Sequence, residues 1–164
     1  MRIEIRTGTV DDAEAIAGVI QTAFRDVAEK FALTPQNAPS HPSNCTGDWI
    51  RSDLNTGFQY LVAEDDGDIV GCVAYKKITT LVAEAQRLAV THRGKKIADL
   101  LNRAVIDRAV EDGIETTRIS IVAQHEALRR WYLRMGFIER ESRAFDHLPF
   151  EVQYLELRLN KADH

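Results

Sequence analysis

The chain has 164 residues, of which 45% are hydrophobic and 28% are charged. This composition excludes a disordered or fibrous chain, and the length suits one domain, residues 1–164, with a core of its own. The 25 acidic and 21 basic side chains are interspersed and give a net charge of −4, so we do not expect a nucleic-acid-binding protein.

Cysteine content and hydropathy indicate the compartment. Cys45 and Cys72 are too few for a disulfide framework, which favours a reducing environment. The first six residues alternate in polarity and lack the apolar run of a signal peptide. No apolar run reaches the roughly 18 residues that a membrane span needs. We therefore expect a cytoplasmic protein that does not bind a membrane.

The first third of the chain predicts one strand and three helices. Isoleucine alternates with charged residues over 2–6, which predicts a half-buried strand. From Asp11 onward, apolar residues recur at helical spacing: Ile16, Val19, Ile20 and Ala23. A second helix is expected over Arg25–Leu33. A third is expected over Asp48–Leu54, after a proline-containing loop at 34–46.

The rest of the chain predicts a strand-rich pattern. Two strands, Phe58–Ala63 and Ile69–Lys77, form a hairpin around an Asp-Gly turn. A strand at Val82–Val90 leads into the longest helix, Lys95–Glu111, which Gly113 ends. The closing elements are a strand over Thr117–Ala123, a helix over Glu126–Arg134 and a strand pair over Phe137–Arg143 and Val152–Leu159. A mixed α/β sheet with helices on both faces follows, with a right-handed parallel crossover at residues 82–123.

A basic, glycine-bearing turn separates the strand ending at Val90 from the longest helix. Arg93, Gly94, Lys95 and Lys96 lie where the helix exposes unpaired peptide N–H groups and a partial positive charge. Such a site suits a pyrophosphate, and glycine lets the backbone approach the anion. An ordinary strand-to-helix turn with solvated cations explains the same residues.

A second candidate lies at the end of the helix over 126–134. Tyr132 precedes Gly136 and Phe137, so its hydroxyl could face a cleft and donate a proton to a leaving group. The alternative is that Trp131, Tyr132 and Phe137 are core aromatic residues beside a helix-ending glycine.

Together the two segments resemble the GNAT family of N-acetyltransferases. In this family a Leu-x-Val-like strand leads into an Arg/Gln-x-x-Gly-x-Gly/Ala loop, and a Tyr-x-x-x-Gly-Phe helix end follows. The chain has Arg87-Leu88-Ala89-Val90, then Arg93-Gly94-Lys95-Lys96-Ile97-Ala98, then Tyr132-Leu133-Arg134-Met135-Gly136-Phe137. Lys96 stands where the pattern has glycine, and the loop is about two residues short. If Lys96 has a positive φ, it is strained; if it is ordinary helix, it is harmless.

The resemblance implies a mostly antiparallel, six- to seven-stranded mixed sheet with a central splayed parallel strand pair. Acetyl-CoA would lie in the opening as cosubstrate, with no metal. The resemblance places the cofactor at Leu88, Ala89, Val90, Arg93, Gly94, Lys95, Lys96, Ile97, Ala98 and His125. For His125, the alternative is that it simply begins the following helix.

The resemblance also implies direct attack of an amine on the thioester. Tyr132 would protonate the departing thiolate, and Glu84 would accept the amine proton directly or through a water. A surface or paired carboxylate is the alternative for Glu84. Asp146 and His147, in the last strand connection, would contact the acceptor, although Asp146 also suits a turn.

The implied partner is a primary amine of a small molecule or peptide. The last strand pair could form a homodimer. The competing hypothesis is a GNAT-shaped module that binds an acyl-CoA or has a regulatory role without turnover.

Overall fold

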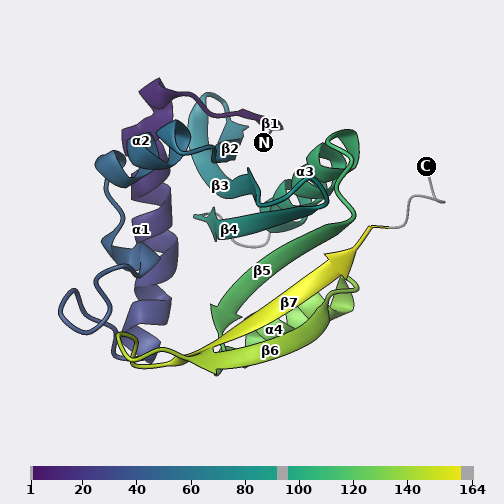
Figure 1. Ribbon diagram of the computed structural model, residues 1–164. Helices are drawn as coiled ribbons and strands as arrows, with labels where there is room; N and C mark the ends of the chain where they lie inside the picture. The colour runs from purple at the N-terminus through teal and green to yellow at the C-terminus, as the bar shows by residue number, and fades with distance from the viewer. Residues whose placement is uncertain (1, 92–95, 160–164) are drawn as a thin grey trace.

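The chain folds around a seven-stranded sheet with strand order β1-β2-β3-β4-β5-β7-β6. The structure, a computed structural model, describes residues 2–91 and 96–159 (Figure 1). The elements are β1 Ile3–Thr7, α1 Ala13–Lys30, α2 Gly47–Asn55, β2 Gln59–Asp65, β3 Asp68–Lys77, β4 Val82–Val90, α3 Ile97–Glu111, β5 Thr116–Val122, α4 Glu126–Arg134, β6 Ile138–Ala144 and β7 Glu151–Arg158. Short 3₁₀ helices at Val10–Asp12 and Pro42–Asn44 precede α1 and α2.

The parallel pair β4 and β5 lies at the centre of an otherwise antiparallel sheet. The two strands pair only between Val82–Glu84 and Thr116–Arg118. Beyond that point they diverge, as Figure 1 shows. The expected mixed, mostly antiparallel sheet with a splayed parallel pair is confirmed.

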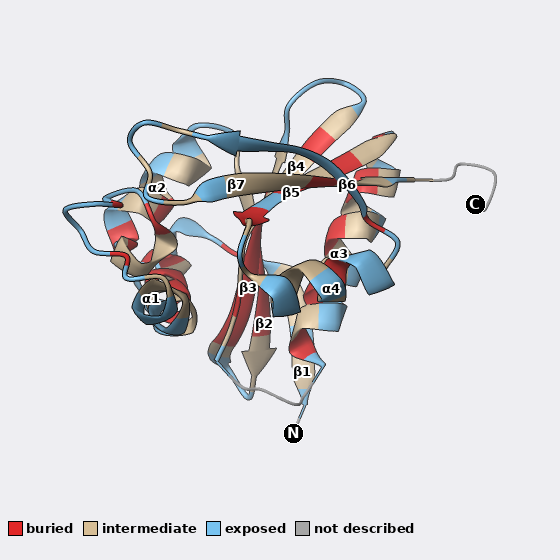
Figure 2. Ribbon diagram, turned by 90° about the horizontal axis from the view of Figure 1, so that it is seen from below, coloured by how far each residue is buried: buried red, intermediate tan, exposed pale blue. Residues whose placement is uncertain are grey.

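Helices cover both faces of the sheet, as expected (Figure 2). Ile16 of α1 and Ile50 of α2 are buried on one face. Leu101 and Val105 of α3 are buried on the other, and Tyr132 of α4 is buried at the β5–β7 end. Among the described residues, no helix is long and apolar enough to cross a membrane.

Helix α3 packs close to β3 because residue 71 is glycine. A Cβ on Gly71 would lie 3.0 Å from Ile97 Cγ2 and 3.0 Å from Leu101 Cδ1. It would also lie 3.2 Å from the carbonyl oxygen of Ala89, which cannot rotate away. Gly71 therefore fixes the first turn of α3 beside the end of β4.

The sequence-based prediction of a separate helix over Arg25–Leu33 is wrong. Helix α1 runs unbroken over Ala13–Lys30. No proline or glycine interrupts residues 19–33, and the apolar stripe continues through Phe24 and Val27. The start of α3 also differs, because the helix begins at Ile97 and not at Lys95.

Candidate active site

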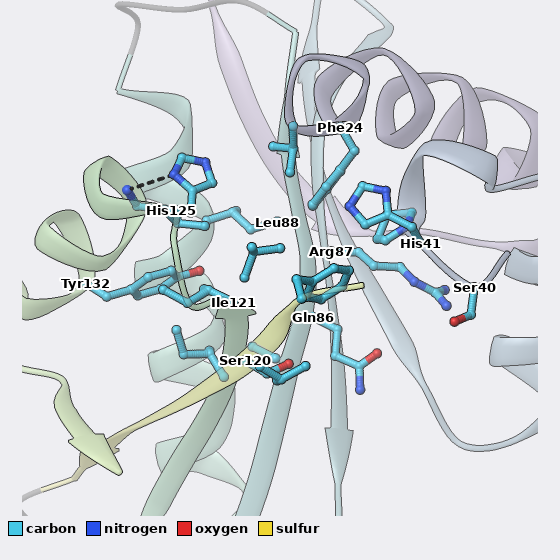
Figure 3. A pocket seen from close by; sticks show the side chains of 18 of the residues that line it. Phe24, Ser40, His41, Gln86, Arg87, Leu88, Ser120, Ile121, His125 and Tyr132 are labelled. Carbon is cyan, nitrogen blue, oxygen red and sulfur yellow. Dashed lines mark hydrogen bonds between the residues drawn. The ribbon is translucent and has the colours of Figure 1, made fainter. Parts of the chain in front are cut away.

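A cavity of about 290 Å³ lies where β4 and β5 diverge (Figure 3). Residues of α1, the 34–46 loop, β4, β5, α4 and the β6–β7 connection line it. Most of the lining is apolar: Phe24, Val27, Pro42, Val73, Ala85, Leu88, Ile119, Ile121, Val122, Leu128, Leu148, Phe150 and Val152. The polar lining residues are Ser40, His41, Gln86, Arg87, Ser120, His125 and Tyr132.

A β-bulge in β4 lies beside this cavity. Arg87 and Leu88 lie opposite the single residue Val73 of β3, and Arg87 adopts a left-handed conformation with φ of 55°. Strict strand alternation predicts that only one of Gln86 and Arg87 faces the cleft. Both nevertheless line the cavity, as do their neighbours Ala85 and Leu88, because the cavity lies at the open edge of β4 and is reached from both faces of the strand.

The outer half of β4 directs main-chain groups into the gap between the strands. The N–H of Thr91 donates to the carbonyl of Val70 at 2.9 Å, so it points toward β3. Successive peptide groups of a strand point to opposite edges, so those of Leu88 and Val90 point toward β5. β5 pairs with β4 only as far as Glu84, which leaves these groups facing the opening.

Helix α3 begins beside the same opening. Arg93, Gly94 and Lys95 lie outside the described residues. Lys96 is the N-cap, with φ of 55° and ψ of 23°, so the strained alternative applies and the residue is not ordinary helix. The side chain of Ile97 is buried under the helix, and that of Ala89 is buried on the α1 face. Ile97, like Ala98 at the first turn, would meet a ligand through its main chain, whereas the peptide groups of Ala89 face its partner Cys72 on β3 and not the gap.

Tyr132 lies on α4 with its hydroxyl directed into the cavity (Figure 3). The residue is only 6% exposed, and its ring packs at 71° to Trp131 and to Phe137, with centroid distances of 4.9 and 5.1 Å. Both expectations for this residue hold together, because the ring is a core aromatic group and the hydroxyl faces a cleft. Burial raises the pKa of the phenol, which keeps it protonated at neutral pH.

His125 begins α4 and also lines the cavity. It is the N-cap of α4, where Nδ1 accepts from the N–H of Leu128 at 3.4 Å, and it lines the cavity. Burial, followed by the nearby charge of Lys30, lowers the pKa of His125. The ring is therefore neutral and, with Nδ1 as acceptor, carries its proton on Nε2.

Residues 15–137 match the sequence pattern of the Acetyltransferase (GNAT) family. The chain belongs to this family. The matched region runs from α1 to Phe137 and so includes both strands that diverge and the Tyr132 helix. A search of curated protein sequences gives no significant match.

Solved structures give the same GNAT fold at low sequence identity. The PaiA N-acetyltransferase from Thermoplasma acidophilum, in complex with coenzyme A, has a TM-score of 0.74 and 21% identity, covering 97% of this chain and 100% of that chain. A putative acetyltransferase, yncA, from Salmonella typhimurium with its cofactor acetyl-CoA has a TM-score of 0.69 and 18% identity, with coverage of 97% and 95%. The ribosomal-protein-S18-alanine N-acetyltransferase from Escherichia coli has a TM-score of 0.76 and 15% identity, with coverage of 96% and 94%.

Within this GNAT domain, Glu84 lies at the vertex of the splayed pair. It forms the last paired position of β4, opposite Arg118 of β5, and it is half-buried. Its Oε1 accepts from Nε2 of Gln86 at 3.3 Å, and Gln86 lines the cavity whereas Glu84 does not. In this geometry Glu84 does not contact an amine bound in the cavity directly.

The expected acceptor residues Asp146 and His147 are both exposed and do not line the cavity. Their neighbours Leu148 and Phe150, in the same connection, do so. In this connection the polar residues turn to solvent and the apolar residues turn inward, so contact of Asp146 or His147 with an acceptor stays a prediction that the cavity lining does not support.

In the 34–46 loop, His41 reaches the cavity and Asn44 does not. His41 is 6% exposed and packs edge-on against Phe24, with ring centroids 5.8 Å apart. Its Nδ1 accepts from the N–H of Ser43 at 3.2 Å, and burial lowers its pKa to about 4. His41 is therefore a neutral ring at pH 7 whose Nε2 is a donor.

A buried polar network behind the cavity was missed by sequence reasoning. Nη1 of Arg87 forms an ion pair with Asp53 Oδ2 and donates to the hydroxyl oxygen of Tyr60 at 2.8 Å. Tyr60 in turn donates to Asp53 Oδ2 at 2.6 Å. The guanidinium carbon also lies 5.5 Å from the centre of the Trp49 ring. Asp53 and Arg87 are 34 residues apart, so no local signal in the sequence pairs them.

Proposed function

We propose that this GNAT acetyltransferase transfers an acetyl group from acetyl-CoA to a primary amine of a small molecule or peptide by direct attack. One observation carries the proposal. The gap between β4 and β5 has strand main chain on one edge, a helix N-terminus at its open end and the hydroxyl of Tyr132 in its floor.

The main-chain edge of β4 suits the amide-bearing arm of coenzyme A. The peptide groups of Leu88 and Val90 could pair with that arm as they would with an added strand. The peptide N–H groups at the start of α3, from Lys96 to Ala98, could hold the pyrophosphate, together with Arg93, Gly94 and Lys95. When bound, acetyl-CoA supplies the thioester that the amine attacks. His125 would contact it from α4.

Two proton transfers accompany the proposed reaction. The amine nitrogen forms a bond to the acetyl carbon as the carbon–sulfur bond breaks, and the sulfur leaves as a thiolate. Tyr132 would protonate that thiolate from its neutral phenol form. The amine proton would reach Glu84 through a water, because Glu84 lies outside the cavity lining.

The test is coenzyme A release from acetyl-CoA with a panel of amines, alongside acetyl-CoA binding measured by calorimetry. Amine-dependent release supports the transferase. Tight acetyl-CoA binding without release by any amine would favour the module without turnover. Absence of acetyl-CoA binding would overturn both the transferase and the acyl-CoA-binding module without turnover.

A role for Glu84 has a separate test. Glu84→Gln should lower kcat/KM most at low pH, where few acceptor molecules have already lost their proton, and less at high pH. The exposed carboxylate variant Glu139→Gln serves as the matched control. A uniform loss at all pH values would contradict a base function of Glu84 and indicate a structural one.

A further inference from the structure

The walls of the cavity give information about its acceptor. Among the described residues that line it, none is aspartate or glutamate, and Arg87 carries the one permanent charge. Four apolar side chains, Phe24, Val27, Leu148 and Phe150, line the region away from the splayed strands. A polycationic amine would have to leave water here without a carboxylate to receive its second charge, which is unfavourable.

Asp53 and Tyr60 hold the side chain of Arg87 in place and leave some of its N–H donors for a ligand. Within the described part of the chain, its side-chain hydrogen bonds to Asp53 and Tyr60 both use Nη1. Nε and Nη2 therefore keep their N–H groups for another acceptor. In Figure 3 the guanidinium lies on the Ser40 side of the pocket, across from Tyr132. A guanidinium fixed by a carboxylate behind it presents a planar, bidentate fork to a second carboxylate.

Arg87 lies in the β-bulge of β4. The bulge places Arg87 and Leu88 opposite the single residue Val73, and both line the cavity. The left-handed φ of 55° is unfavourable at a non-glycine residue, so the fold accepts strain at this position.

We propose that the acceptor is an amino carboxylate: a small molecule whose amine faces the Tyr132 side, whose apolar body lies between Phe24 and Phe150, and whose carboxylate binds Arg87. This rests on the proposed acetyl transfer and names its substrate class. The cavity of about 290 Å³ also has to hold the acetyl end of the proposed cofactor, which favours a small acceptor.

The experiment compares matched amines that differ in the carboxylate alone. Coenzyme A release is measured with L-phenylalanine and phenethylamine, and with 5-aminopentanoate and pentylamine. The methyl ester of each acid keeps the body and removes the charge, and spermidine represents a polycation. We expect kcat/KM to be about 10- to 100-fold higher for an acid than for its matched amine, as for one hydrogen-bonded charge pair.

Variants of the ion pair show whether Arg87 is responsible. Arg87→Gln combined with Asp53→Asn removes both charges and leaves neither partner buried alone. The double variant should reduce the ratio of kcat/KM for an acid to kcat/KM for its matched amine toward one. Arg87→Lys should reduce this ratio partially, because the planar guanidinium fork is lost. The control is Arg51→Gln with Asp48→Asn, which removes an exposed ion pair of α2 that does not line the cavity and should leave the ratio unchanged.

The outcomes separate the two proposals. Turnover of phenethylamine, pentylamine or spermidine without preference for any acid overturns the amino-carboxylate inference and leaves the acetyl transfer standing. A preference for acids that survives the Arg87 and Asp53 substitutions also overturns the inference, because the carboxylate then binds elsewhere. Acetyl-CoA binding without release by any of these amines, or by the wider panel, overturns the transferase proposal, and the inference fails with it.

Discussion

Replacing Tyr132 by phenylalanine isolates the proposed proton donor. The substitution removes one hydroxyl and keeps the ring, whose edge contacts with Trp131 and Phe137 stay in place. Among the described residues, no group hydrogen bonds the Tyr132 hydroxyl. The free energy of unfolding should therefore change by less than about 1 kcal/mol, since no buried partner loses a hydrogen bond.

Activity should respond much more strongly than stability. A positioned general acid contributes about 10²- to 10⁴-fold to a rate, or about 3–5 kcal/mol of barrier. Because the cavity can admit water as a weaker donor, we expect Tyr132→Phe to fall at the lower end, near a 100-fold loss of kcat. The Kd for acetyl-CoA should change by less than about threefold, because the proton is needed only once the thiolate forms.

The assay is steady-state coenzyme A release combined with calorimetric titration of acetyl-CoA. Tyr154→Phe on β7 is the matched control, because Tyr154 lies outside the cavity lining, beneath the guanidinium of Arg118. It should keep wild-type kcat. Equal losses of kcat and of cofactor affinity in Tyr132→Phe, or wild-type kcat, would refute the assignment of Tyr132 as the acid.

Three further predictions concern stability and its dependence on pH. Gly71→Ala should lower the free energy of unfolding, measured by urea denaturation, by about 1–3 kcal/mol because the added Cβ meets Ile97. Gly18→Ala has open space around it in a helix and should raise the same free energy by up to about 1 kcal/mol. The opposite order of the two variants would contradict the packing argument. Lys96→Gly should raise Tm by about 2 °C by removing the left-handed strain, and a lower Tm would count against it. The pKa of His41 is lowered to about 4 in the folded chain, so between pH 6.5 and 4 the unfolded chain binds a proton that the folded chain does not. The free energy of unfolding should therefore decrease by about 2 kcal/mol from pH 6.5 to 5. A His41→Asn variant whose free energy of unfolding falls equally with pH would disprove the role of this ring.

Local patterns predict most of the elements of this fold from sequence. The strand Val82–Val90 and the helix Glu126–Arg134 have the predicted bounds. The hairpin turn also agrees, because Asp66 and Gly67 both adopt positive φ, as a two-residue Asp-Gly turn requires. These features depend on neighbours in the chain, so the sequence contains the information directly.

The residues that shape the cavity are harder to find from sequence. The bulge at Arg87 depends on how β4 pairs with β3, and strand alternation alone cannot show it. Phe24 is assigned to a helix junction that does not exist, although its continuation of the apolar stripe is a usable signal. In the β6–β7 connection, Asp146 attracts attention as a charged residue, while the cavity uses the apolar Phe150.

The bulge in β4 has an evolutionary consequence. On either side of it the register with β3 is regular: Ala74 pairs with Gln86, and Cys72 pairs with Ala89. Deleting Arg87 would leave Leu88 opposite Val73 and both flanking registers intact. Residue 87 can therefore be replaced, together with its partner Asp53, without realigning the strand edge proposed for the cofactor. In this scaffold a paired change at residues 87 and 53 can alter the acceptor end of the site while the proposed coenzyme edge stays the same.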